Sequence, residues 1–155
     1  MSSSHVFPKT DELLVVALGG VVGALARAGI GAAIPHNDPG SWPWATFVTN
    51  LLGCLVLGFV LAYADGRHDH WLTTAPHKAR LIRPLLATGV LGGFTTFSSF
   101  SVEVVRLIRA DEQLLAGLYA TGSVVLGLVL FALARAMAAG WFGRTDIDLS
   151  ADEEL

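Results

Sequence analysis

Apolar residues dominate four long segments of the chain, and short polar segments separate them. The apolar segments cover residues 13–34, 44–64, 84–105 and 114–139. Each reaches the roughly 20 mostly apolar residues that an α-helix needs to cross a bilayer. The first contains one charged residue, Arg27, and the second contains none. This pattern predicts an all-α membrane protein with four transmembrane helices.

The polar segments complete the predicted organisation. Residues 1–12 form an N-terminal tail, residues 13–140 form one transmembrane domain, and residues 141–155 form an acidic tail that we expect to be disordered. The middle loop, residues 65–83, is polar and basic. A signal peptide is disfavoured for the first span, because acidic residues precede it and its apolar run is too long. Four spans place both termini on one side of the membrane.

Composition supports a membrane protein. The chain has 155 residues, of which 53% are hydrophobic and 15% charged, whereas about a quarter of the residues of a soluble domain are charged. The net charge of -3 gives no basic surface, so we expect no nucleic-acid partner. The single cysteine, Cys54, excludes a disulfide framework within the chain.

Lysine and arginine residues are distributed unevenly across the two sides of the predicted bundle. Arg106 and Arg109 lie on the side opposite the termini. Seven lie on the side of the termini and the middle loop: Lys9, Arg67, Lys78, Arg80, Arg83, Arg135 and Arg144. Because positively charged loops stay in the cytoplasm, we expect a multi-pass protein of the cell membrane with both termini in the cytoplasm.

Polar residues inside the spans are candidates for function, because polar groups at membrane depth face the interior of a bundle. Thr46 and Asn50 are four residues apart in the second span, and Tyr119 and Ser123 are four apart in the fourth, so each pair shares a helical face. All four side chains can donate a hydrogen bond, and none is charged. They either line a pathway or only hold helices together.

The third span contains adjacent glycines, Gly92 and Gly93, in its apolar part. Glycine is a poor helix former and lets the backbone open. Carbonyls freed at this depth persist only where they line a cavity or bind a ligand, and such oxygens suit a hard cation such as Na⁺. The alternative is a small-residue packing face, Gly89-x-x-x-Gly93, and Gly19-x-x-x-Gly23 of the first span has the same interpretation.

Phe97 and Phe100 follow the glycines and share a helical face, since they are three residues apart. Packing is the usual role of such a pair, but the edges of phenyl rings are electropositive and can contact an anion. Hydroxyl donors surround the two rings: Thr96, Ser98, Ser99 and Ser101. Without a cationic residue nearby in the sequence, dipoles alone would hold an anion, which favours a small, strongly hydrogen-bonding one.

Three motifs resemble the CrcB/Fluc family of fluoride channels, and the resemblance covers all four spans. The third-span motif is long and specific: Gly92-Gly93-Phe94-Thr95-Thr96-Phe97-Ser98-Ser99-Phe100-Ser101, followed by Glu103. The supporting motifs are Gly19-Gly20-x-x-Gly23-Ala24-x-x-Arg27 in the first span and Thr46-Phe47-x-x-Asn50-x-x-Gly53 in the second.

The resemblance implies an antiparallel, dual-topology-type dimer with two fluoride pores and one Na⁺ at its centre. The ion would be structural, held by main-chain oxygens at the break of the third helix, which match Gly92 and Thr95 of both subunits. The uneven charge favours a chain of fixed orientation. The partner is therefore either a second copy of this chain or, as the charge favours, an oppositely oriented homologue.

The resemblance also assigns site residues. The fluoride pore matches six of them: Asn50, Phe97, Phe100, Thr46, Tyr119 and Ser123. We expect Arg27 to reach a membrane surface or, by preference, a water-filled vestibule. Glu103 matches the family without an assigned role, and helix capping or pairing with Arg106 is the plain alternative.

Together these expectations predict a fluoride-selective channel, not an enzyme, through which F⁻ leaves the cytoplasm passively, driven by the inside-negative potential. Fluoride that arrived as neutral HF would ionise in the cell, and the pore would relieve its toxicity. A small four-span proton-coupled exporter is the alternative, and Glu103 is its only candidate for a titratable group in the pathway. A membrane scaffold would leave the third span unexplained, and the five histidines lie outside the spans, which disfavours an enzyme.

Overall fold

Helices are the only regular elements among the described residues, which are 10–35, 38–67 and 74–152 of the computed structural model. Their order is α1 (Thr10–Ala33), α2 (Trp44–Gly66), α4 (Pro76–Arg83), η1 (Pro84–Leu91), α5 (Gly92–Phe94), α6 (Phe97–Arg109) and α7 (Gln113–Asp152). Four stretches are long and apolar enough to cross a membrane: Thr10–Ala33, Trp44–Gly66, Arg80–Arg109 and Gln113–Trp141. The prediction of an all-α protein with four membrane helices is confirmed.

Several helices extend beyond the predicted boundaries. α1 already begins at Thr10, and residues 1–9 of the predicted N-terminal tail lie outside the described residues. α4 occupies part of the segment predicted as a loop and starts with a proline, whose fixed φ suits a first helical position. The expectation of a disordered acidic tail is wrong for residues 141–152, because α7 continues to Asp152. Extending a formed helix requires no new nucleus, and the tail contains no proline.

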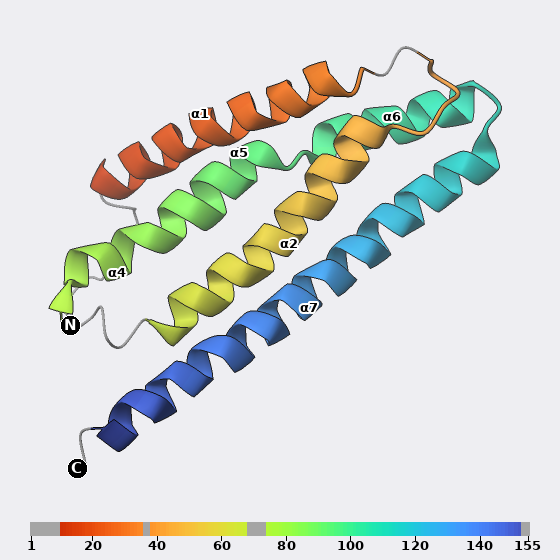
Figure 1. Cartoon of the computed structure of the whole chain (residues 1–155). Helices are drawn as coiled ribbons and strands as arrows, with labels where there is room; N and C mark the ends of the chain where they lie inside the picture. The colour runs from red at the N-terminus through yellow and green to blue at the C-terminus, as the bar shows by residue number, and fades with distance from the viewer. Residues whose placement is uncertain (1–9, 36–37, 68–73, 153–155) are drawn as a thin grey trace, which may run out of the picture.

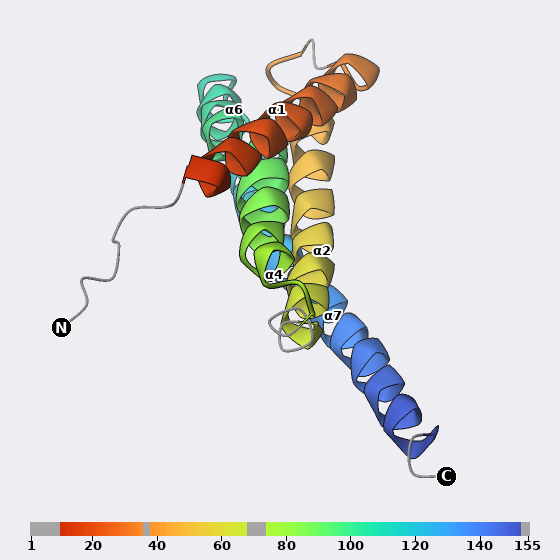
Figure 2. The same ribbon diagram turned by 90° about the vertical axis from the view of Figure 1, so that its left-hand side faces the viewer.

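The four spans pack as two pairs that the third span joins. α2 lies along α7, and α1 lies against η1 and α5 (Figure 1). Figure 2 shows α1 crossing the third span obliquely. α6, the second half of the third span, packs on α7 instead of α1. The junction between the two halves of the third span therefore lies between the two pairs, at the centre of the bundle.

The third span changes its winding before that junction. η1 has π-helical winding, in which the Gly92 N–H bonds to the carbonyl of Ala87, five residues earlier. The winding starts at Pro84, whose ring has no N–H to donate to the preceding turn. π-helical segments are rare and often accompany functional sites. The hydrophobic pattern gave no sign of this change.

Ion pairs connect all four spans at the end of the bundle where α2 finishes. Asp65 accepts Arg83 of the third span at 3.3 Å and Arg135 of α7 at 2.9 Å. Arg80 of α4 pairs with Glu12 of α1 at 3.2 Å. The start of α1 and the C-terminal half of α7 consequently lie at the same end (Figure 1), as four membrane crossings require.

Large apolar side chains are exposed on the outer faces of the single chain. Leu18 and Leu25 of α1 are 65% and 67% exposed, and Leu128 and Met137 of α7 are 64% and 73% exposed. Soluble monomers rarely expose contiguous apolar surface of this extent. Lipid chains or an apolar partner are the natural environment of these faces.

Glycines set the close approach of α1 to the third span. Gly19 and Gly23 face Gly89 and Gly93 across the helix pair. A Cβ on Gly19 would lie 3.0 Å from the Cα of Gly89, and one on Gly23 would overlap the carbonyl oxygen of Val90. The packing interpretation of both glycine pairs is therefore confirmed.

We expect Gly23→Ala to destabilise the protein by about 1–3 kcal/mol, because the added methyl forces α1 away from the third span. Gly20→Ala is the matched control, since a Cβ at Gly20 meets no atom within 4 Å. Thermal unfolding of the two variants in detergent micelles measures the difference. Equal midpoints for both variants would contradict the packing described above.

Candidate ion pathway

The third span is interrupted at Thr95 and Thr96, which are both extended, with φ/ψ of -74°/157° and -145°/121°. The sequence predicted an opening at Gly92-Gly93, but these two residues are helical and belong to α5. The prediction of a broken third helix is thus confirmed, with the break two to three residues later than expected. Gly93 packs against the backbone of Gly20 in α1, and Gly92 lines a cavity.

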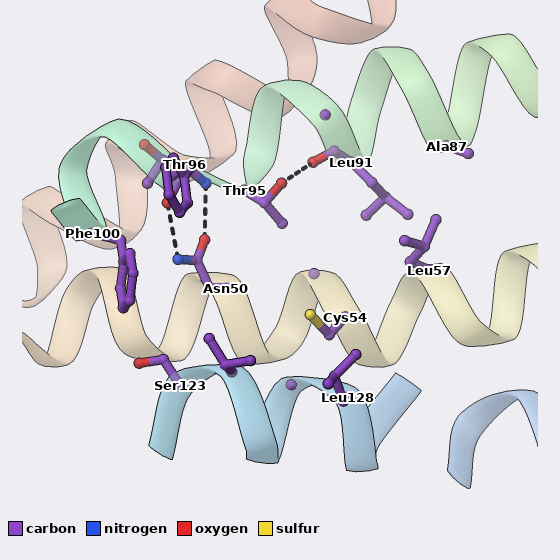
Figure 3. Close-up of a pocket in the computed structure, with 15 residues that line it drawn as sticks. Asn50, Cys54, Leu57, Ala87, Leu91, Thr95, Thr96, Phe100, Ser123 and Leu128 are labelled. Carbon is purple, nitrogen blue, oxygen red and sulfur yellow. Dashed lines mark hydrogen bonds between the residues drawn. The ribbon is translucent and has the colours of Figure 1, made fainter. Parts of the chain in front are cut away.

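Asn50 of α2 binds the interrupted backbone with both ends of its amide. The Thr96 N–H donates to Asn50 Oδ1 at 2.9 Å, and Asn50 Nδ2 donates to the Thr96 carbonyl at 3.0 Å (Figure 3). A backbone unit outside a helix and at membrane depth needs such protein partners. The Asn50 side chain is therefore the support that keeps Thr96 out of the helix.

The same contacts release two carbonyl oxygens. In an uninterrupted α-helix, the Gly92 carbonyl would accept the N–H of Thr96, and the Thr95 carbonyl would accept the N–H of Ser99. The Thr96 N–H instead bonds Asn50, and the Ser99 N–H bonds the Thr96 hydroxyl at 3.2 Å. The two residues predicted to bind Na⁺ through main-chain oxygens have thus lost these helical donors. Such hard oxygen ligands fit an alkali cation.

Arg27 of α1 also binds the broken helix. Its Nε donates to the carbonyl oxygen of Gly93 at 3.3 Å. A cation is favourable at the C-terminal end of a helical segment, where carbonyls lack partners. The expectation of a membrane surface or a vestibule did not foresee this contact, which joins residues 66 positions apart in the sequence.

A cavity of about 460 Å³ lies between α2, α7 and the third span (Figure 3). It brings together six of the predicted site residues: Asn50, Gly92, Thr95, Phe97, Phe100 and Ser123. None of the residues that line it is charged. Ser123 Oγ is buried there without a hydrogen-bond partner among the described residues. The cavity can therefore offer hydroxyl and ring-edge contacts to an ion, but no ionic partner.

Three further predicted residues form a hydrogen-bonded group beside the cavity. Thr46 Oγ1 and Tyr119 Oη each donate to one carboxylate oxygen of Glu103, both at 2.7 Å. Thr46 is 8% exposed and Tyr119 is fully buried. Glu103 has no ion pair with Arg106 among the described residues, so the pairing alternative is wrong. The capping alternative is also wrong, because Glu103 lies in the middle of α6 and Thr96 is its N-cap. The two polar faces identified in the sequence meet at this carboxylate.

Aromatic rings connect this group to the cavity. The Phe100 ring lies 5.9 Å from that of Phe97 and 5.3 Å from that of Tyr119, measured between centroids. Phe97 is 80% exposed in the single chain, whereas Phe100 is half-buried. Trp42 covers the other side of Tyr119, with 5.5 Å between ring centroids. Sequence reasoning missed Trp42, because a loop residue before α2 has no helical spacing to relate it to Tyr119.

We expect Asn50→Ala to lower the free energy of unfolding by about 2–4 kcal/mol, because it leaves a backbone N–H and a carbonyl unpaired inside the bundle. Cys54→Ala is the control, since Cys54 lies one turn further along α2 and lines the same cavity without bonding the break. Unfolding of both variants in micelles tests this. A Cys54→Ala loss as large as that of Asn50→Ala would refute the role of the amide.

The fold and the cavity define a multi-pass membrane protein whose third span is interrupted beside an uncharged, partly polar cavity. Comparison with known proteins identifies the family. The family model described as "CrcB-like protein, Camphor Resistance (CrcB)" matches residues 14–135. The chain belongs to this family.

Curated relatives named "Fluoride-specific ion channel FluC" match most of the chain. The relative from Hyphomonas neptunium is 45% identical over 118 residues, which cover 76% of this chain and 87% of the relative. The relative from Nitratidesulfovibrio vulgaris is 38% identical over 120 residues, with coverages of 77% and 90%. A relative from Thermus thermophilus is 42% identical over 121 residues, with coverages of 77% and 89%.

Proposed function

We propose that this chain forms a fluoride-selective ion channel that relieves fluoride toxicity by passive efflux. Its relatives carry the name of fluoride-specific channels. The observation that carries the proposal is the convergence of Asn50, Phe97, Phe100 and Ser123 on one uncharged cavity beside the broken helix. Four residues that the sequence predicted to line the pore therefore line the same cavity.

Selectivity for fluoride follows from the chemistry of such a lining. Phenyl edges and hydroxyl groups offer positive partial charges without a cation. A small anion approaches these dipoles closely and accepts strong hydrogen bonds, so it recovers more of its lost hydration than chloride does. The absence of a charged lining residue also avoids trapping the ion, which must leave as readily as it binds.

The driving force is the membrane potential. Fluoride that enters as neutral HF ionises at the higher pH of the cytoplasm, and the inside-negative potential then expels the anion through an open path. A proton-coupled exporter would instead require a carboxylate that takes part in transport. Glu103, the candidate for that role, already accepts two hydroxyl hydrogen bonds beside the cavity.

The complete channel is an antiparallel dimer in this proposal. Phe97, a predicted pore residue, is 80% exposed in the single chain, and a second subunit would enclose it. The excess of lysine and arginine at one end favours a chain of fixed orientation with cytoplasmic termini. Its partner is then an oppositely oriented homologue, and a second copy of this chain is the alternative.

A structural Na⁺ at the centre of the dimer completes the proposal. The carbonyl oxygens of Gly92 and Thr95 would bind it from both subunits. The loss of their helical donors to Asn50 and Thr96 supports this assignment. When bound, the ion would offset the partial negative charge of these carbonyl oxygens and hold together the interrupted third spans of the two subunits.

Fluoride efflux from liposomes that contain this chain tests the function, with a K⁺ ionophore to relieve the build-up of charge and a fluoride electrode as the detector. Once the antiparallel dimer is complete, with a second copy of this chain or with the homologue, we expect rapid fluoride efflux and no chloride efflux. Phe97→Ile should slow it about tenfold, because an aromatic contact is worth about 0.5–1.5 kcal/mol and 1.36 kcal/mol corresponds to tenfold in rate. Phe59→Ile, which replaces an exposed ring outside the cavity, should leave the rate unchanged.

The same assay separates the alternatives. Efflux that appears only on co-reconstitution with an oppositely oriented homologue assigns the chain to a heterodimer. Efflux that requires a pH gradient and persists without the K⁺ ionophore identifies a proton-coupled exporter. Absence of efflux in all of these conditions rejects the channel function for this chain.

Na⁺ should stabilise the purified protein specifically. At a concentration about a hundredfold above its Kd, a ligand that binds only the folded protein adds about 2.7 kcal/mol of stability. We expect the unfolding midpoint to rise with Na⁺ and to saturate, while K⁺ at equal ionic strength has little effect. Asn50→Ala should abolish the Na⁺ effect and Cys54→Ala should retain it. Identical responses to Na⁺ and K⁺ would reject the sodium site.

A further inference from the structure

Trp42 carries a buried polar atom that the proposed pathway does not yet use. Its Nε1 is buried and has no hydrogen-bond partner among the described residues. Two other buried side-chain atoms of the described residues also lack a partner. One of these, Arg80 Nε, lies 3.2 Å from the Glu12 carboxylate. The other, Ser123 Oγ, lines the cavity. The Trp42 indole therefore remains to be explained.

The chemistry of the indole restricts what satisfies it. Its N–H can only donate, so its partner must be an acceptor. Leaving such a group buried and unpaired costs about 1–3 kcal/mol, and buried unpaired groups of native proteins commonly serve a function or bind water or an ion. An aromatic residue without the N–H, such as phenylalanine, would pack here without this cost.

The surroundings of Trp42 join it to the candidate pathway. Its ring stands edge-to-face against the rings of Tyr119 and Phe47, at interplanar angles of 81° and 82°. Tyr119 in turn contacts Phe100, which lines the cavity. Cavity, Phe100, Tyr119 and Trp42 thus form one continuous row of contacts. The row leads to the start of α2, at the end of the bundle opposite the Asp65 ion pairs.

We infer that Trp42 is an additional anion-binding residue of the pathway, whose buried indole N–H donates to the ion beside Tyr119. The inference rests on the proposed fluoride channel, and it names a donor that lies outside the pore residues predicted from the sequence. A small, strongly accepting anion is the ligand that this site takes. A neutral donor also matches the uncharged lining of the cavity.

Indole N–H resonances measure this contact directly. The full-length protein is labelled with ¹⁵N at its four tryptophan indoles, and the Trp42 signal is assigned by its loss in Trp42→Phe. We expect fluoride to shift that signal downfield and saturably, while chloride at equal ionic strength leaves it in place. A Trp42 signal that fluoride does not move, or that chloride moves equally, overturns the inference.

Flux through the Trp42→Phe variant provides the second measurement. The substitution keeps an aromatic ring and removes the donor, so we expect fluoride efflux to fall about tenfold. Trp44→Phe is the matched control, because Trp44 contacts the rings of Trp42 and Phe47 but is 55% exposed. Equal rates for the two variants and the parent protein overturn the inference while leaving the channel function intact.

The two measurements fail independently. A saturable fluoride shift at Trp42 without any efflux from the parent protein, either alone or with an oppositely oriented homologue, supports the site and rejects the proposed channel. If Trp42→Phe does not fold, as judged by its elution and unfolding midpoint, the titration of the parent protein still decides. Trp44→Phe, Trp71→Phe and Trp141→Phe then assign the other three signals, and the Trp42 signal is the one that remains.

Discussion

A backbone amide that leaves a helix inside an apolar span has no water to replace its lost partner, so the protein itself must supply one. In this chain the side chain of Asn50 supplies both partners that Thr96 needs. Without that amide, the N–H and the carbonyl of Thr96 would lie unpaired at membrane depth. The interruption, the released carbonyls of Gly92 and Thr95, and the position of Phe97 at the start of α6 all depend on this pair of hydrogen bonds.

The cavity beside the interruption combines polarity with the absence of charge. Its donors are dipoles, and the nearest carboxylate, Glu103, is bound by the hydroxyls of Thr46 and Tyr119. Arg27, the one charged residue of α1 beyond its first turn, binds a carbonyl of the broken helix on another side. The charged side chains near the cavity are thus hydrogen-bonded to other groups, and none lines the cavity. Such a lining suits an anion that must dissociate as readily as it binds.

Much of this molecule could be predicted from local sequence. The four spans follow from runs of apolar residues, because the bilayer imposes the same length and hydrophobicity on each helix independently. The glycine pairs of α1 and the third span indicated close helix packing, and the structure confirms it. The third-span motif indicated the family, and the polar pairs at Thr46/Asn50 and Tyr119/Ser123 indicated which helical faces point inward.

Contacts between distant parts of the chain decided the rest. The sequence placed the opening at Gly92-Gly93, but both glycines are helical and Gly93 packs against α1. Asn50, 46 positions from Thr96, binds the break at Thr95-Thr96 instead. The partners of Glu103, the contact of Arg27 with the third span and the contact of Trp42 with Tyr119 likewise join segments that no helical period relates. Local patterns determine which segments enter the membrane. Inside the membrane there is no water to bond polar groups, so each must find its partner within the protein, often on a neighbouring helix, and only the tertiary structure decides which helices are neighbours.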